Sequence, residues 1–220
     1  MTSVDRAKAS EFSGRLDDIM ARQPVLPVLT VPSADKAVRL AEVLLAAGLP
    51  VMEVTLRTPD ALESIRRMRA VQGAIVGAGT ILNAADAEAA IAAGAEFVVT
   101  PGLSVATVSA CVAHDVPVLP GVATASEIMS GLEMGLERFK FFPAEHAGGR
   151  HMLAALHGPF PSVRFCPTGS ITLDLSPGYL ATANVAMVGG GWVAPKRLIE
   201  VEAWEEIAWN ADKAAKLKRG

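Results

Sequence analysis

The sequence predicts an α/β fold, a single (β/α)8 barrel (TIM barrel), and three observations carry this prediction. From Pro24 onward, short β-branched or apolar runs alternate with Ala-, Leu- and charge-rich stretches at helical spacing. Loops containing Gly, Pro or Thr separate them. The unit recurs about every 23 residues, which suits a strand-helix repeat, and eight such units close a barrel.

The apolar runs define eight candidate strands. They are Val25–Val31, Val51–Leu56, Ala74–Gly79, Glu96–Thr100, Val116–Pro120, Arg138–Phe142, Ser162–Cys166 and Asn184–Val188. The stretches between them read as helices, for example Ala34–Ala47, which has Ser33 as its expected N-cap and Gly48 just past its end. Residues 1–220 therefore make one barrel domain.

Helices are also expected at both ends of the chain. Residues 1–23 form an N-terminal extension in which Asp5–Arg22 is an amphipathic helix preceding the first strand. Val201–Leu217 is the last helix, and its Trp204 and Trp209 are expected to pack against the barrel.

Composition excludes several classes of function. Hydrophobic residues make up 51% of the 220 residues and aromatic residues only 5%, so aliphatic side chains build the core. The formal net charge is −3, with 20 basic and 23 acidic residues spread along the chain, so neither nucleic acid nor an anionic membrane is an expected partner. Cys111 and Cys166 form no metal-ligand or disulfide pattern. Mixed charges and no apolar core in the first twenty residues predict a soluble, cytoplasmic protein.

The second strand carries polar side chains on one face. Glu53, Thr55 and Arg57 alternate with apolar residues, and side chains alternate between the helix layer and the interior of a barrel. The polar set therefore faces the interior, near the C-terminal end where such barrels place their active sites. A buried Glu and Arg on one face form either a structural ion pair or a site.

The sixth strand favours a site. In Arg138–Phe142 the residues Phe139 and Phe141 take the helix-facing side, which leaves Lys140 inside. Burial and a neighbouring cation disfavour the charged form of an amine, and the neutral amine is the nucleophile that attacks a carbonyl. The alternative is that Lys140 only neutralises Glu53 in a buried salt bridge.

Small residues follow the seventh and eighth strands. Gly169 and Ser170 follow one strand, and Gly190 and Gly191 follow the other. Such residues let backbone N–H groups approach an anion, and this end of the barrel is where phosphate is commonly bound. These four residues are the predicted phosphate-binding set.

Several motifs together resemble the 2-keto-3-deoxy-6-phosphogluconate (KDPG) and 4-hydroxy-2-oxoglutarate (KHG) aldolases. They are EVTLRT from Glu53, VGAGT from Val76, TPGL from Thr100, RFKFFPAE from Arg138 and RFCPTG from Arg164. The resemblance runs from about Pro24 to Pro195. It implies a homotrimeric (β/α)8 barrel without a metal or other cofactor. It also implies a lysine Schiff base that yields pyruvate and glyceraldehyde 3-phosphate in the Entner–Doudoroff pathway.

The resemblance assigns a role to each matching residue. Lys140 corresponds to the Schiff-base lysine and Glu53 to the general acid/base. Arg57 and Thr80 correspond to contacts with the pyruvate carboxylate. The residues that correspond to the lining of the pyruvate end are Pro101, Phe142 and Thr168.

Two positions depart from the family pattern. The family usually has Thr-Gly-Gly-Ile after the seventh strand and Gly-Gly-Ser-Trp after the eighth, whereas this chain has Ser170 and Gly191 there. We hypothesise that the hydroxyl has moved from one loop to the other across the phosphate. The alternative for the substrate is an unphosphorylated 4-hydroxy-2-keto acid, cleaved by a related aldolase. Two alternatives for the function also remain. One is a catalytically silent barrel that binds a phosphorylated sugar acid, and the other is an epimerase or isomerase without a metal.

Overall fold

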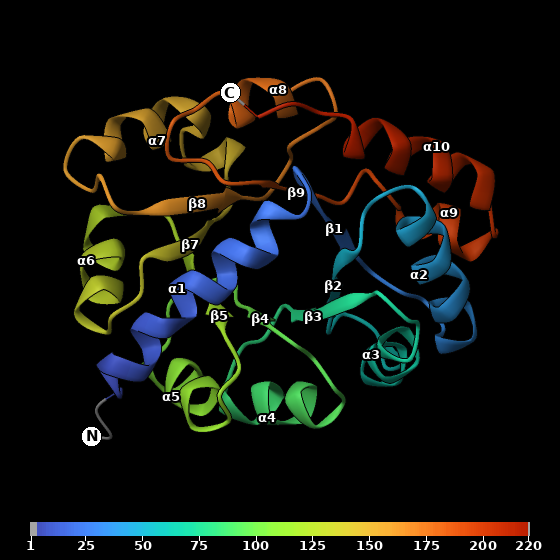
Figure 1. The fold of residues 1–220 in the computed structure, drawn as a ribbon, viewed down its shortest axis with the longest axis horizontal. Coiled ribbons are helices and arrows are strands. Elements are labelled where there is room, and N and C mark those ends of the chain that lie inside the picture. The colour runs from blue at the N-terminus through green and yellow to red at the C-terminus, as the bar shows by residue number, and fades with distance from the viewer. Residues whose placement is uncertain (1–3, 220) are drawn as a thin grey trace.

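The computed structural model describes residues 4–219, in which parallel strands curl around a centre and helices surround them (Figure 1). The strands are β1 Val25–Leu29, β2 Val51–Thr55, β3 Ile75–Gly79, β4 Val98–Val99, β5 Val118–Leu119, β6 Gly121–Val122, β7 Arg138–Phe141, β8 Arg164–Pro167 and β9 Val188–Gly190. The α-helices are α1 Arg6–Ala21, α2 Ala37–Ala46, α3 Ala61–Arg69, α4 Ala84–Ala92, α5 Val105–Ala113, α6 Ala125–Glu133, α7 Gly149–His157, α8 Ser176–Leu180, α9 Lys196–Glu200 and α10 Trp204–Ala215, with 3-10 turns η1 Ala34–Lys36 and η2 Glu145–Ala147.

The strands form two parallel sheets. One has six strands in the order β5-β4-β3-β2-β1-β9, and the other has three in the order β6-β7-β8. Only Pro120 separates β5 from β6 along the chain, and two isolated parallel bridges, Phe165 to Val185 and Thr168 to Gly189, link the β8 and β9 segments. The prediction is thereby confirmed as an α/β fold with a curled parallel sheet.

The bounds of the predicted strands differ from those in the structure, and the fifth and eighth strands show why. Of the fifth, expected at Val116–Pro120, only β5 at Val118–Leu119 is a strand, and a further strand, β6, follows at Gly121–Val122. Pro120 separates the two, because proline lacks the N–H needed for a ladder hydrogen bond. The eighth, expected at Asn184–Val188, is β9 at Val188–Gly190. Its glycines read as a loop in the sequence, but they belong to a strand that approaches its neighbour closely.

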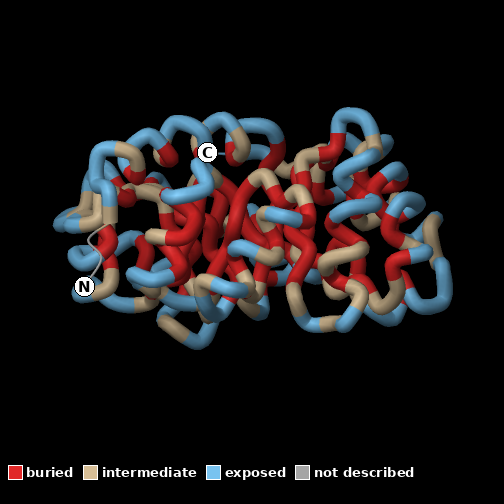
Figure 2. The backbone as a smooth tube through the Cα atoms, turned by 90° about the horizontal axis from the view of Figure 1, so that it is seen from below, coloured by how far each residue is buried: buried red, intermediate tan, exposed pale blue. Residues whose placement is uncertain are grey.

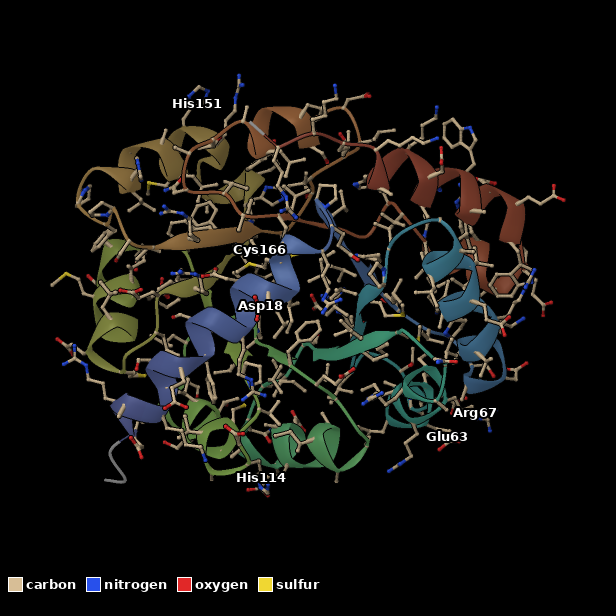
Figure 3. All side chains as sticks on the ribbon, in the orientation of Figure 1. Asp18, Glu63, Arg67, His114, His151 and Cys166 are labelled. Atoms are coloured by element: carbon tan, nitrogen blue, oxygen red, sulfur yellow. The ribbon has the colours of Figure 1, made fainter. Side chains whose placement is uncertain are left out.

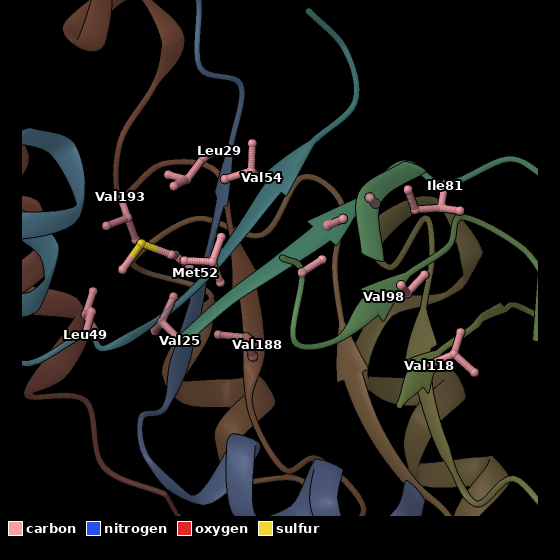
Figure 4. Packing of buried hydrophobic residues seen from close by; sticks show 14 of the residues in the cluster. Val25, Leu29, Leu49, Met52, Val54, Ile81, Val98, Val118, Val188 and Val193 are labelled. Carbon is pink, nitrogen blue, oxygen red and sulfur yellow. The ribbon is translucent and has the colours of Figure 1, made fainter. Parts of the chain in front are cut away.

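An outer hydrophobic core joins the strands to the helices (Figure 4). Alternation along each strand supplies it, so Phe139 and Phe141 of β7 both face the helix layer, as predicted. A methyl group on Gly131 of α6 would overlap the Phe139 ring, so the missing side chain lets helix and strand pack closely. The buried backbone occupies the middle of the molecule in Figure 2.

A second cluster fills the interior of the curled sheets. It consists of Leu16, Met20, Leu26, Val51, Phe97, Val99, Leu119, Cys166 and Met187. Leu16 and Met20 come from α1, which lies across one end of the strands in Figure 1. This helix closes the end of the molecule opposite the C-terminal ends of the strands.

The terminal helices agree only partly with the expectations. The predicted Asp5–Arg22 helix is α1, and the Asp5 side chain caps it by accepting from the Lys8 N–H. The predicted last helix, Val201–Leu217, is longer than the observed one, because α10 begins at Trp204 and ends at Ala215. Trp209 was expected to pack against the barrel, but the residue is 57% exposed. None of the described helices is both long and apolar enough to cross a membrane.

The helix expected at Ala34–Ala47 begins with the 3-10 turn η1 before α2. Ser33 is the N-cap residue of that turn, but its hydroxyl donates to the Asp35 carboxylate and makes no capping hydrogen bond to the backbone. Gly48 ends the helix in the left-handed conformation, φ +88°, as predicted.

Helix α1 is held to β7 by a two-point ion pair. Arg138 Nε and Nη2 donate to the two Asp17 oxygens at 2.6 and 2.7 Å, and these bonds raise the pKa of Arg138. The Arg138 side chain is only 13% exposed, so losing its partner leaves a poorly hydrated cation.

We expect Asp17→Asn to lower the free energy of unfolding by about 1–3 kcal/mol, the cost of an unsatisfied buried group. Denaturant titration followed by circular dichroism measures this loss. The control is Asp18→Asn, since Asp18 is the adjacent aspartate on the same helix and is exposed (Figure 3). Equal destabilisation by both substitutions would show that the Asp17–Arg138 pair does not anchor α1.

Candidate active site

Lys140 and Glu53 come together from different sheets. Lys140 lies on β7 and is 5% exposed, and Glu53 lies on β2 and is 1% exposed. The distance from Lys140 Nζ to Glu53 Oε1 is 3.6 Å. Both side chains point into the space that the curled sheets enclose, because their neighbours in sequence pack outward against the helices.

The pair is not a fully satisfied salt bridge. No hydrogen bond from any described residue reaches either carboxylate oxygen of Glu53. A buried carboxylate without such bonds costs free energy, and a cost of this kind is typical of groups kept for chemistry. The carboxylate is free to accept a proton close to the amine. The purely structural interpretation of Lys140 therefore accounts poorly for this geometry.

Gly79 makes the space for the Glu53 carboxylate. Gly79 ends β3 and pairs with Thr55 of β2. A methyl group at position 79 would overlap Glu53 Oε1, so the acid could not keep its position beside Lys140. The second glycine of VGAGT is thus required because the Glu53 side chain approaches its backbone closely.

Phe142 lies beside the lysine, and the Pro101 loop lies beside its strand pair. The Lys140 Nζ lies 5.2 Å from the centre of the Phe142 ring, within the range of a cation–π contact. Gly121 pairs with Lys140 across β6 and β7, and a methyl group on it would overlap the Pro101 backbone. The loop that holds Pro101 therefore lies next to the strand pair that presents the amine.

Arg57 and Thr80 meet at the C-terminal ends of β2 and β3. Arg57 Nε donates to Thr80 Oγ1 at 3.2 Å. Thr80 has a φ of +59°, a conformation that few non-glycine residues adopt and that is common at functional sites. The guanidinium is exposed at the mouth, where its remaining N–H groups can bind an anion.

Arg57 also lines a cavity of about 260 Å³ with residues from the last two strand ends. Phe142, Thr168, Gly169, Ser170 and Gly191 line it as well. The two loops that depart from the family pattern thus face one cavity. Most of the predicted site residues therefore meet around this mouth.

Gly190 differs from its predicted place. Gly189 and Gly191 line the cavity, whereas a methyl group on Gly190 would approach Val25 and Trp192 on the other side of β9. Side chains along a strand alternate between its faces, so three consecutive glycines cannot all face the same cavity. Gly189 instead accommodates Thr168, whose side chain would overlap any Cβ at position 189.

Sequence reasoning missed two lining residues, Thr30 and Lys196. Thr30 follows β1, and its hydroxyl lies 3.2 Å from that of Thr55. Lys196 begins α9, just beyond the glycine loop. Thr30 is a polar residue directly after a strand, a position where barrels of this kind place site residues, so the sequence could have identified it. Lys196 begins a helix six residues after β9, so its place in the sequence carries no such signal.

The cysteine inside the curled sheets is chemically quiet. Cys166 pairs with Lys140 across β7 and β8 and lies near the centre of Figure 3. Burial, and after it the negative charge of Glu53, raise the pKa of its thiol to about 12. The thiol is therefore neutral at physiological pH and unreactive. Among residues 4–219, no three His, Cys, Asp or Glu side chains lie close enough together to hold a metal ion.

Comparison with known proteins agrees with this geometry. The KDPG and KHG aldolase family profile matches residues 16–209. The 2-dehydro-3-deoxy-phosphogluconate aldolase of Zymomonas mobilis is 50% identical over 82% of this chain and 86% of its own.

Two crystal structures are also similar. The Zymomonas mobilis aldolase with 3-phosphoglycerate has a TM-score of 0.87 and 46% identity, and the alignment covers 93% of this chain and 97% of that one. The Legionella pneumophila KDPG aldolase, with pyruvate captured as a covalent carbinolamine intermediate, has a TM-score of 0.88 and 40% identity, with 91% and 98% covered. The chain therefore belongs to the KDPG and KHG aldolase family.

Proposed function

We propose that this chain cleaves KDPG to pyruvate and glyceraldehyde 3-phosphate through a Schiff base on Lys140. The buried Lys140–Glu53 pair, whose charged groups are 3.6 Å apart, is the observation that carries the proposal. A nucleophilic amine next to a carboxylate that can move protons is what imine-forming aldol cleavage requires.

The cleavage proceeds through a carbon–nitrogen double bond. Lys140 Nζ attacks the C2 carbonyl of the substrate, and loss of water from the carbinolamine gives an iminium ion. Glu53 accepts the proton of the C4 hydroxyl while the C3–C4 bond breaks, and the iminium takes up the electron pair as an enamine. Glyceraldehyde 3-phosphate leaves, Glu53 returns the proton to C3, and water releases pyruvate from Lys140.

The remaining residues position the substrate. Arg57 and Thr80 bind the pyruvate carboxylate, for which a guanidinium fork is well suited. Phe142 shields the enamine from solvent, and Pro101 and Thr168 line the same end. Gly169, Ser170 and Gly191 receive the phosphate at the other end of the cavity, and Gly190 supports that loop. The relatives crystallised with a pyruvate carbinolamine and with 3-phosphoglycerate support these two ends of the substrate.

A second reaction fits the same residues. The family profile covers both KDPG and KHG aldolases. 4-Hydroxy-2-oxoglutarate has the same 2-keto acid and C4 hydroxyl, so the Lys140 and Glu53 chemistry would release pyruvate and glyoxylate. The smaller product leaves the phosphate end of the cavity unused.

The wider organisation belongs to the same proposal. We propose that the two curled sheets are arcs of one closed (β/α)8 barrel with the predicted N-terminal extension as an added helical segment; residues 1–3 and 220 of the predicted domain lie outside the described residues. The short gap at Pro120 and the bridges between the β8 and β9 segments support closure. From the resemblance to the family we also propose a cytoplasmic homotrimer that acts in the Entner–Doudoroff pathway without a metal or other cofactor.

Lys140→Arg should abolish turnover of KDPG, because a guanidinium stays protonated and cannot form the carbinolamine. A coupled assay of pyruvate release measures this for KDPG and for 4-hydroxy-2-oxoglutarate. Lys213→Arg, on the exposed face of α10, is the control and should keep full activity. If Lys140→Arg retained more than about a hundredth of the wild-type rate, Lys140 could not be the nucleophile.

Glu53→Gln should lower kcat by roughly 10²–10⁴-fold, the contribution of a positioned acid/base. Slow imine formation with pyruvate should remain detectable, since Lys140 is intact. Single-turnover kinetics separate the two steps. A kcat close to that of the wild type would assign Glu53 a structural role only.

Arg57→Ala should raise the KM for pyruvate in the condensation direction by roughly tenfold or more, the effect of losing a charge-assisted hydrogen bond. The KM for the aldehyde should change much less. Arg57→Lys keeps the charge without the fork and should lie between. An unchanged KM for pyruvate would remove Arg57 from the carboxylate site.

A further inference from the structure

The cavity at the mouth carries two positive charges and no negative one. Arg57 and Lys196 are its charged lining residues, and no carboxylate from the described part of the chain lines it. KDPG is an anion at both ends, with a carboxylate on C1 and a phosphate on C6. Two cations in one cavity therefore match the two ends of that substrate. Arg57, which donates to Thr80, is the residue proposed above for the carboxylate, so Lys196 remains for the phosphate.

Lys196 is free to serve a ligand because its present partner holds it weakly. Its Nζ lies 3.2 Å from Glu200 Oε1, in an i,i+4 pair on the surface of α9. The two side chains are 52% and 47% exposed, and pairs of this kind contribute little to stability. A phosphate dianion in the cavity would compete readily with Glu200 for the ammonium group.

Ser170 marks the place where the phosphate would lie. Its φ of +58° is left-handed, a conformation that favours glycine, yet this residue carries a hydroxyl into the cavity rim. The Ser170 Oγ lies 3.3 Å from His146 Nε2, its hydrogen-bonding neighbour at this rim. A left-handed backbone at Ser170, in a cavity that the Lys196 ammonium group also lines, points to a ligand.

We propose that Lys196 binds the phosphate of the substrate and sets the preference for phosphorylated over unphosphorylated 2-keto acids. This inference rests on the proposed cleavage of KDPG and adds a residue to it. Gly191 offers no hydroxyl, so the ammonium of Lys196 together with the Ser170 hydroxyl supplies the donors at this end. A charge-assisted contact with phosphate exceeds a neutral one in strength.

The test compares substrates that differ only in the phosphate. The ratio of kcat/KM for KDPG to that for 2-keto-3-deoxygluconate should fall by roughly tenfold or more in Lys196→Ala, as expected when a charged hydrogen-bond donor is lost. Lys196→Glu should lower the ratio further, and Lys196→Arg should keep most of it. Inorganic phosphate should also inhibit the wild type more strongly than Lys196→Ala.

Arg197→Ala is the matched control. Arg197 is the next residue of α9, pairs with Glu206 and does not line the cavity, so its loss should leave the ratio unchanged. An unchanged ratio in Lys196→Ala, with the wild type active on KDPG, would overturn the role of Lys196 alone. Equal losses in Lys196→Ala and Arg197→Ala would also overturn it, by reducing Lys196 to general surface charge. If the wild type cleaved neither substrate, the proposed function would fail, and this inference with it.

Discussion

The burial of an amine and a carboxylate next to each other, from strands of two different sheets, is the constraint on which the rest of the structure depends. Lys140 and Glu53 lie 3.6 Å apart with less than a tenth of either residue exposed. Removing two charges from water costs more than their attraction returns unless the geometry is well held. The outward packing of Phe139 and Phe141 and the absence of a side chain at Gly79 hold that geometry. The fold thus stabilises a pair that would be unfavourable in an ordinary core.

The mouth gathers residues from several strand ends. Phe142 lies next to the amine, and it lines one cavity together with Arg57, Thr168, Ser170 and Lys196. The close approach of β9 to Thr168 at Gly189 brings the last loop within reach of the others.

Local patterns in the sequence predicted the parts of the site that strand alternation controls. Lys140 and Glu53 could be placed inside because apolar neighbours claimed the opposite faces. The sequence pattern could not reveal that Gly190 faces away from Gly191. The predicted strand ended at Val188, before these glycines, and a run of glycines has no alternation of polar and apolar side chains that would show which face each residue takes. Lys196 was missed because a surface lysine at the start of a helix carries no local signal; only the tertiary fold brings it to the cavity that Ser170 also lines. Pro120 likewise interrupts a strand in a way that apolar composition alone does not reveal.

The central claim is that Lys140 forms a covalent imine with the 2-keto acid. Incubation of the protein with pyruvate and borohydride, followed by mass spectrometry of the peptide that contains Lys140, tests it directly. We expect a reduced pyruvate adduct on Lys140 in the wild type, weaker labelling in Glu53→Gln and none at that position in Lys140→Arg. The absence of an adduct in the wild type, or an adduct on another lysine, would contradict it and would leave a silent binding barrel or an epimerase as the better description.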